Sequence, residues 1–195
     1  MTLPTERLEA IVREKRAASG APGIAVGVVA RGELAWFLGS GWADLDRGTS
    51  PSEHSLARVA SVTKTFTATA VLQLRDRGLL SLEDPLELHL PEFGEAQERG
   101  GHRREVTIRA LLTHRSGLVT ESPGTSWDGP NFPSMAEILA ALPRTAVVIP
   151  RYTIWKYSNL GFALLGEVVA RRSGQAYVDY LQSQVFEPLG LTETA

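Results

Sequence analysis

The chain of 195 residues contains no cysteine. A disulfide framework, a cysteine nucleophile and a thiolate metal site are therefore excluded. The sequence also has no apolar run of the roughly 18 residues that a membrane-spanning helix needs, so it predicts no membrane span. The segment 1–20 is charged and amphipathic and lacks the apolar centre of a secretory signal, so we expect a cytoplasmic location.

A surplus of charge of one sign is also missing. The 20 Lys and Arg residues nearly balance the 22 Asp and Glu residues, and no basic or acidic block occurs. This balance argues against a nucleic-acid partner. The 43% hydrophobic content is ordinary for a globular protein, and the length is sufficient for one domain with a real core.

Several familiar site patterns are absent as well. Gly20, Gly23 and Gly27 do not form the dinucleotide-binding pattern Gly-x-Gly-x-x-Gly. No Gly-x-Ser-x-Gly occurs, so the nucleophile turn of an α/β-hydrolase is not indicated. His54, His89 and His102 have no partner four residues away among themselves, and we expect no metal.

The order of the elements predicts an α+β protein. Residues 5–18 have helical spacing, and the apolar run 23–30, a turn and residues 33–43 predict a buried strand and a β-hairpin. We interpret the chain as a single domain, 1–195. Residues 1–58 form its N-terminal helix and hairpin, and residues 59–195 form a mostly helical part that carries the site.

The helical part contains one unusual helix and several shorter ones. The unusual helix is predicted from about Ser61 to Arg77, and because its side chains are mostly small or apolar we expect it to be buried on most sides. Further helices are predicted at 106–113 with Thr107 as cap, 134–142, 160–171 and 175–186. A mobile surface loop is predicted at 92–105, and a loop typical of site walls at 120–133.

Ser61 and Lys64 stand three residues apart in the first turn of that helix, and therefore on one face. An amine in an apolar site near the positive end of a helix dipole has its charged form disfavoured. A neutral Lys64 can accept the serine proton, which is the Ser-x-x-Lys pattern of an activated nucleophile. The alternative is a serine that only caps the helix and a lysine that reaches solvent.

Tyr157 and Asn159 form a second signal, Tyr-x-Asn, directly before an apolar helix. The stretches SVTK, LLTHRSGL and YSNLGFALLGEVV together closely resemble the serine β-lactamase-like superfamily. The Tyr-Ser-Asn form is similar to the branch that holds class C β-lactamases, D-alanyl-D-alanine carboxypeptidases and family VIII esterases. The resemblance extends from the hairpin to EPLGLTET near the end of the chain.

This resemblance implies a fold, an acyl-enzyme mechanism and roles for four residues. The implied fold is an antiparallel sheet flanked by helices, with a helical subdomain. Ser61 matches the nucleophile, Lys64 its general base, Tyr157 the proton shuttle to the leaving group, and Asn159 the residue that binds substrate and orients Lys64. The Ser61 N–H would be one oxyanion donor. The family needs no metal or cofactor.

One family motif is missing: no Lys or His followed by Ser, Thr or Ala and then Gly occurs on a later strand. We therefore interpret the chain as the N-terminal portion of the domain, truncated before the C-terminal strands, and expect weak or no activity from it alone. The substrate is expected to be a small ester, β-lactam or D-amino-acid amide. The alternative is a non-catalytic scaffold or binding module, and the oligomeric state stays open.

Three further residues near these motifs are noted. Histidine is a common catalytic residue, but the position of His114 at a predicted helix end favours a structural role. Trp127 and Trp155 either line a substrate cleft or pack against neighbours, and the sequence does not choose between the two.

Overall fold

The computed structural model describes residues 3–129 and 132–194. It divides into two compact units, Met1–Arg58 and Val59–Ala195, and each is described by itself. Of the residues in the predicted loop 120–133, Pro130 and Asn131 lie outside the described part.

The first unit is a helix and a β-hairpin. Helix α1 spans Thr5–Ser19, and strands β1 (Gly23–Ala30) and β2 (Glu33–Gly41) pair antiparallel. Arg31 and Gly32 both have positive φ, which gives the turn whose twist matches the two strands. The predicted helix and hairpin are confirmed, with β2 two residues shorter than expected.

The prediction of a buried strand at 23–30 is wrong. No residue of β1 is fully buried, and Val29 is 69% exposed. Of the helices described in this unit, α1 is the one that packs on the hairpin, and one helix cannot cover both faces of two strands.

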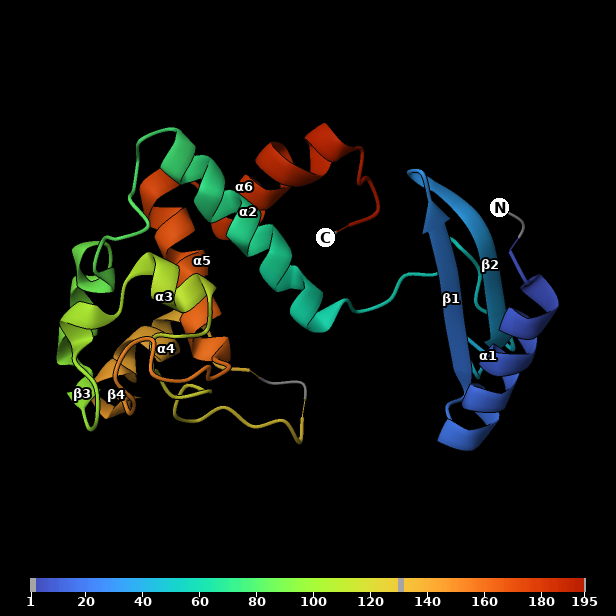
Figure 1. Ribbon diagram of the computed structural model, residues 1–195, viewed down its shortest axis with the longest axis horizontal. Coiled ribbons are helices and arrows are strands. Elements are labelled where there is room, and N and C mark those ends of the chain that lie inside the picture. The colour runs from blue at the N-terminus through green and yellow to red at the C-terminus, as the bar shows by residue number, and fades with distance from the viewer. Residues whose placement is uncertain (1–2, 130–131, 195) are drawn as a thin grey trace. The chain divides into compact units, whose positions relative to one another are not determined.

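The second unit is organised around two helices that lie side by side, α2 (Thr63–Asp76) and α5 (Asn159–Ser173), as Figure 1 shows. A short 3₁₀ turn, η1 (Ala60–Val62), leads into α2. The core contains fully buried side chains from both helices, among them Val71, Leu74 and Leu164.

The expectation that the central helix is buried on most sides is wrong for its first turn. Ser61 and Val62 are exposed and Lys64 is half-buried, while full burial begins at Thr67. The core contacts of α2 lie toward its C-terminal end, so the Ser-x-x-Lys turn projects beyond the core and remains accessible.

Short elements surround these two helices. They are η2 (Leu86–Leu88), η3 (Pro91–Glu95), β3 (Gln97–Glu98), η4 (Arg103–Glu105), α3 (Ile108–Leu112), α4 (Met135–Ala140), η5 (Leu142–Arg144), β4 (Ala146–Val147), α6 (Tyr177–Leu181), η6 (Gln182–Phe186) and η7 (Glu187–Leu189). The predicted cap is present, because the Thr107 side chain accepts from the Ala110 N–H. Ser134, which the sequence analysis did not mark as a cap, forms a capping box with Glu137.

The prediction of a mobile loop at 92–105 is wrong. The segment carries two 3₁₀ turns, and β3 pairs parallel with β4. Glu92 receives two hydrogen bonds from the guanidinium of Arg171 on α5. The charged residues that suggested a solvated loop therefore anchor it to the helical unit.

The predicted helix 175–186 is divided into α6 and the π-helical turn η6. A π turn holds one more residue than an α turn. Here it coincides with burial of Phe186, whose ring meets Phe66 of α2 edge-on at 5.1 Å between centroids. The irregular end of the predicted helix thus lies where Phe186 packs against α2.

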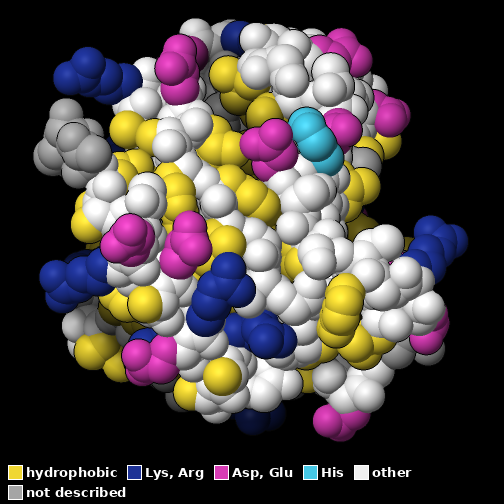
Figure 2. Space-filling model, turned by 90° about the vertical axis from the view of Figure 1, so that its right-hand side faces the viewer, with side chains coloured by type: hydrophobic (Ala, Val, Ile, Leu, Met, Phe, Trp, Pro, Cys, Tyr) yellow, Lys and Arg dark blue, Asp and Glu magenta, His cyan; other side chains and the backbone are white. Residues whose placement is uncertain are grey.

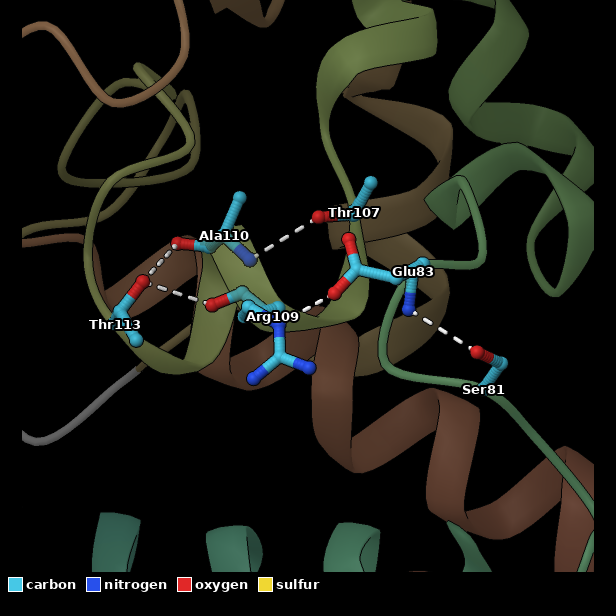
Figure 3. A network of polar contacts seen from close by, with 6 residues as sticks. All are labelled: Ser81, Glu83, Thr107, Arg109, Ala110 and Thr113. Carbon is cyan, nitrogen blue, oxygen red and sulfur yellow. Dashed lines mark hydrogen bonds and ion pairs between the residues drawn. The ribbon is translucent and has the colours of Figure 1, made fainter.

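Figure 3 shows how polar contacts fix α3 to the segment that precedes η2. Arg109 donates to the Glu83 carboxylate, and the Thr113 hydroxyl donates to the Arg109 carbonyl. On the face drawn in Figure 2, side chains of both charges are interspersed with hydrophobic ones. Among the described residues no helix combines the length and the apolarity required to cross a bilayer.

Candidate active site

Ser61 and Lys64 meet at the start of the central helix. Ser61 lies in η1 and Lys64 is the second residue of α2, and the Lys64 Nζ donates to the Ser61 Oγ at 3.3 Å. The spacing of three residues therefore brings the hydroxyl and the amine together, as the sequence predicted.

The residue before Ser61 has an uncommon backbone. Ala60 has φ of 46°, in the left-handed region that costs a side-chain-bearing residue about 1 kcal/mol or more. This conformation sets the angle at which the chain enters the Ser61 turn. Such strained positions are typical of functional sites.

Tyr157 reaches the same hydroxyl from the far end of the chain. Its Oη lies 2.6 Å from the Ser61 Oγ, and either atom can be the donor. The Lys64 Nζ also lies over the Tyr157 ring, 4.8 Å from its centre. A hydroxyl, an amine and a phenol thus converge on one point from segments about a hundred residues apart.

Asn159 also contacts the Lys64 amine, and its Oδ1 accepts a hydrogen bond from the Lys64 Nζ at 2.7 Å. Asn159 is the first residue of α5, so it lies inside the helix and not just before it, as the sequence analysis expected. Ser158 caps this helix by accepting from the Gly161 N–H. The backbone N–H groups of Asn159 and Leu160 both donate to the Thr120 carbonyl, which ties the helix start to the loop 120–133.

Glu121 completes a polar chain that the sequence analysis missed. Its Oε1 accepts from the Asn159 Nδ2 at 2.6 Å, so the amide joins Lys64 on one side to a carboxylate on the other. These two bonds fix which way the amide points. No sequence pattern marked Glu121, because its position depends on the contact between its loop and α5.

The ring of His114 packs against the ring of Tyr157. The two ring centres lie 4.4 Å apart, and the His114 Nδ1 accepts from the Ser158 N–H. Burial, and next the charge of Lys64, lower the pKa of His114 and favour the neutral ring. The predicted structural role agrees with these contacts.

The Tyr157 phenol is electrostatically perturbed. Burial alone raises its pKa, but interactions with Lys64 and the hydrogen bond to Ser61 outweigh that effect and leave the pKa below its usual value. The Tyr157 phenol therefore loses its proton more readily than an ordinary tyrosine does.

Two hollows adjoin this cluster. One, of about 550 Å³, is walled mainly by α2 and α5, with Lys64 and Asn159 in its lining. The other, of about 190 Å³, is lined by Asn159, Glu121 and Trp127 among others. Of the two tryptophans that the sequence analysis left open, Trp127 lines a hollow and Trp155 packs edge-on against His114.

Within residues 3–129 and 132–194, no group of three His, Asp or Glu is placed to hold a metal ion.

Comparison with known proteins gives one family match. The model of the family described as "Beta-lactamase" matches residues 8–195. "Esterase EstB" of Burkholderia gladioli is 35% identical over an alignment of 203 residues, which covers 96% of this chain and 50% of the esterase. The "D-alanyl-D-alanine-carboxypeptidase/endopeptidase AmpH" of Escherichia coli K12 is 32% identical over 90% of this chain and 46% of that protein.

Solved structures show the same likeness in three dimensions. The octameric penicillin-binding protein homologue from Pyrococcus abyssi superposes with a TM-score of 0.83 at 28% identity, over 97% of this chain and 44% of that one. The chain therefore spans half or less of the length of each of these relatives.

Proposed function

This chain belongs to the beta-lactamase family, and from that premise we propose that it carries the acylating site of a serine hydrolase. Ser61 is the nucleophile, Lys64 the general base, Tyr157 the proton shuttle and Asn159 the residue that holds Lys64 and contacts substrate. One observation supports this most: the Ser61 Oγ lies within hydrogen-bond reach of both the Lys64 Nζ and the Tyr157 Oη.

The proposed reaction has two stages. In the first, the Ser61 Oγ attacks the substrate carbonyl carbon while its proton passes to the Lys64 amine. The bond to the leaving group then breaks as the Tyr157 hydroxyl donates a proton to it, and Lys64 returns a proton to Tyr157. In the second stage, water attacks the acyl carbon and its proton passes back through the same groups, which frees Ser61.

Each group has a physical reason to contribute. A serine hydroxyl is a weak nucleophile at neutral pH, and a positioned base or acid typically accelerates a reaction about 10²–10⁴-fold. N–H groups in the opening turn of a helix lack intrahelical partners, so the Ser61 N–H is suited to bind the developing oxyanion. The substrate class we propose is a small ester, β-lactam or D-amino-acid amide, as with the esterase and the carboxypeptidase among its relatives.

The direct test is covalent labelling with a fluorescent fluorophosphonate. We expect the full-length protein to be labelled and its Ser61→Ala variant not to be. Ser50→Ala is the matched control, because Ser50 is exposed and lies in the first unit. Equal labelling of the Ser61→Ala variant, or no labelling of the folded parent protein, would contradict the proposal. The second of these results would instead favour a non-catalytic binding protein.

A further inference from the structure

His114 contacts the chain on both sides of the proposed proton shuttle. We propose that His114 is a positioning residue: in its neutral form it holds the Tyr157 hydroxyl against Ser61, and when it gains a proton it releases that hydroxyl and slows acylation. This inference rests on the proposed function of Ser61 and Tyr157.

Two backbone N–H groups that flank Tyr157 both donate to His114. The Lys156 N–H donates to the His114 carbonyl at 2.8 Å, and the Ser158 N–H donates to the His114 Nδ1 at 3.2 Å. Between these two bonds, the Tyr157 ring lies against the imidazole, with 4.4 Å between ring centres. One residue therefore fixes the shuttle before, at and after its position in the chain.

The bond from the Ser158 N–H to the imidazole is costly to lose. Ser158 is 2% exposed, so water has little access to it. Its hydroxyl is already engaged, because it donates to the Val119 carbonyl and accepts from the Gly161 N–H. A buried N–H without an acceptor is unfavourable, so the backbone shifts when the Nδ1 acceptor is removed. That shift displaces Tyr157, the residue directly before it.

The backbone of His114 has an uncommon conformation. Its φ is 55°, in the left-handed region, at the position after Thr113 where α3 ends. Glycine or asparagine usually occupies this position, and a histidine there has a conformational cost that glycine avoids. Strain of this kind is typical of residues whose side chains are needed at a functional site.

Protonation removes the acceptor that holds Ser158. The neutral imidazole accepts at Nδ1, whereas an imidazolium carries N–H at both ring nitrogens and accepts at neither. Burial, and next the charge of Lys64, lower the pKa of His114. The loss of the acceptor is therefore expected as the pH falls below the ordinary histidine value of about 6.5.

The surroundings of the ring favour its neutral form. Lys64 is the charge that acts on it, while Phe162 and Trp155 contribute uncharged rings. In the part of the chain that the structure describes, the ion pairs of histidine with carboxylates involve other histidines. The titratable or charged groups near the ring are Lys64 on α2, Tyr157 and Lys156 before α5, Arg115 next in the chain, and Glu121, which acts on Tyr157.

Two substitutions separate the acceptor from the titration. Asparagine tolerates a left-handed backbone, and its Oδ1 is bonded to Cγ as the histidine Nδ1 is, so His114→Asn keeps an acceptor that does not titrate. Glycine fits the backbone but has no side chain, so His114→Gly removes the acceptor without adding strain. Arg31→Gly is the matched control, because Arg31 has φ of 56° at an exposed turn of the first unit.

The test measures kcat/KM of the full-length protein on phenyl acetate and p-nitrophenyl acetate, with Ser61→Ala as the blank. Phenoxide is the poorer leaving group, so its departure depends more on the proton from Tyr157. At pH 8 we expect His114→Gly to lose about tenfold or more on phenyl acetate and less on p-nitrophenyl acetate. His114→Asn should stay within about threefold of the parent on both esters, and Arg31→Gly should match the parent.

The pH profile gives a second readout. Between pH 8 and pH 5 the parent should lose activity on phenyl acetate more steeply than His114→Asn, so that the ratio of parent to variant falls about threefold or more. The titration of Lys64 is common to both proteins and cancels in this ratio. A residue that only supports the fold would leave the ratio constant.

Two results would overturn the inference while leaving the proposed function intact. One is a folded His114→Gly variant that keeps the parent's rate or loses equally on both esters. The other is a ratio of parent to His114→Asn that does not change with pH, and this result decides even if His114→Gly does not fold. If neither ester is hydrolysed in a Ser61-dependent way, both the proposed function and this inference are wrong.

Discussion

The two units of this chain differ sharply in what they bury. The helical unit has a core that includes fully buried Leu, Val and Phe side chains from most of its elements. Among residues 3–58 of the helix-and-hairpin unit, the buried residues are Val12 and Ser40. All four proposed site residues belong to the unit with the core. The comparison teaches that the site is held by a packed scaffold, while the hairpin has little of its own to stabilise it.

The largest expected effect is a loss of acylation rate at the proposed site, which lies in the helical unit. Tyr157→Phe removes the hydroxyl that we propose as the proton shuttle and keeps the ring that packs on His114. We expect the acylation rate to fall about 10²–10⁴-fold with little change in thermal stability. Stopped-flow or labelling kinetics measure the rate. An unchanged rate would remove Tyr157 from the mechanism.

The next effect compares the two units directly. Leu164→Ala, at a fully buried position of α5, should lower the free energy of unfolding by about 2–5 kcal/mol. Val29→Ala, at an exposed position of β1, should change it by about 0.5 kcal/mol or less. Urea unfolding measures both. Comparable losses would show that the hairpin unit is buried in solution and break the contrast.

A smaller effect concerns how the helices begin. Ser134 caps α4, whereas α1 follows Pro4 and has no side-chain cap. Ser134→Ala should cost about 1 kcal/mol of unfolding free energy. Aspartate can also cap a helix, so Ser134→Asp should restore the free energy of unfolding if the lost cap, and not a general loss of packing, causes the change. A loss that Asp does not restore would contradict the capping account.

The smallest expected effect is a pH dependence confined to the helical unit. Burial, and next the charge of Arg172, lower the pKa of His89 despite its bond to Asp84, and burial also lowers that of His114. The folded protein thus binds fewer protons than the unfolded chain. The stability contributed by the neutral rings is complete above the ordinary histidine pKa of about 6.5 and is lost as pH falls through the lowered values.

We therefore expect the Tm to fall between pH 7 and pH 5, and to fall less in His89→Gln. His54→Gln is the control, because His54 is exposed and lies in the first unit. Calorimetry measures how much the Tm changes between pH 7 and pH 5. If His54→Gln reduces this change as much as His89→Gln does, the assignment to buried histidines is wrong.

The family and the fold class could be predicted from the sequence, and both are confirmed. Helical spacing alone placed Ser61 beside Lys64, and the predicted helix end at Arg77 is one residue past the last residue of α2, Asp76. These successes depend on contacts between residues close in sequence, where periodicity carries the information.

The misses share a physical cause. The parallel β3–β4 pair is only two residues long, too short for any periodic signal. The anchoring of Glu92 by Arg171, the irregular end around Phe186 and the bond from Asn159 to Glu121 all depend on contacts between distant segments. The roles of the four site residues and the single-domain organisation remain predictions.

The central claim is that Ser61 is the activated nucleophile, and peptide mapping after fluorophosphonate labelling tests it most directly. Trypsin cleaves after Arg58 and Lys64, which isolates Ser61 in the six-residue peptide 59–64. Our account predicts that the mass of the adduct appears on this peptide and nowhere else. An adduct on any other serine, with this peptide unmodified, would contradict it.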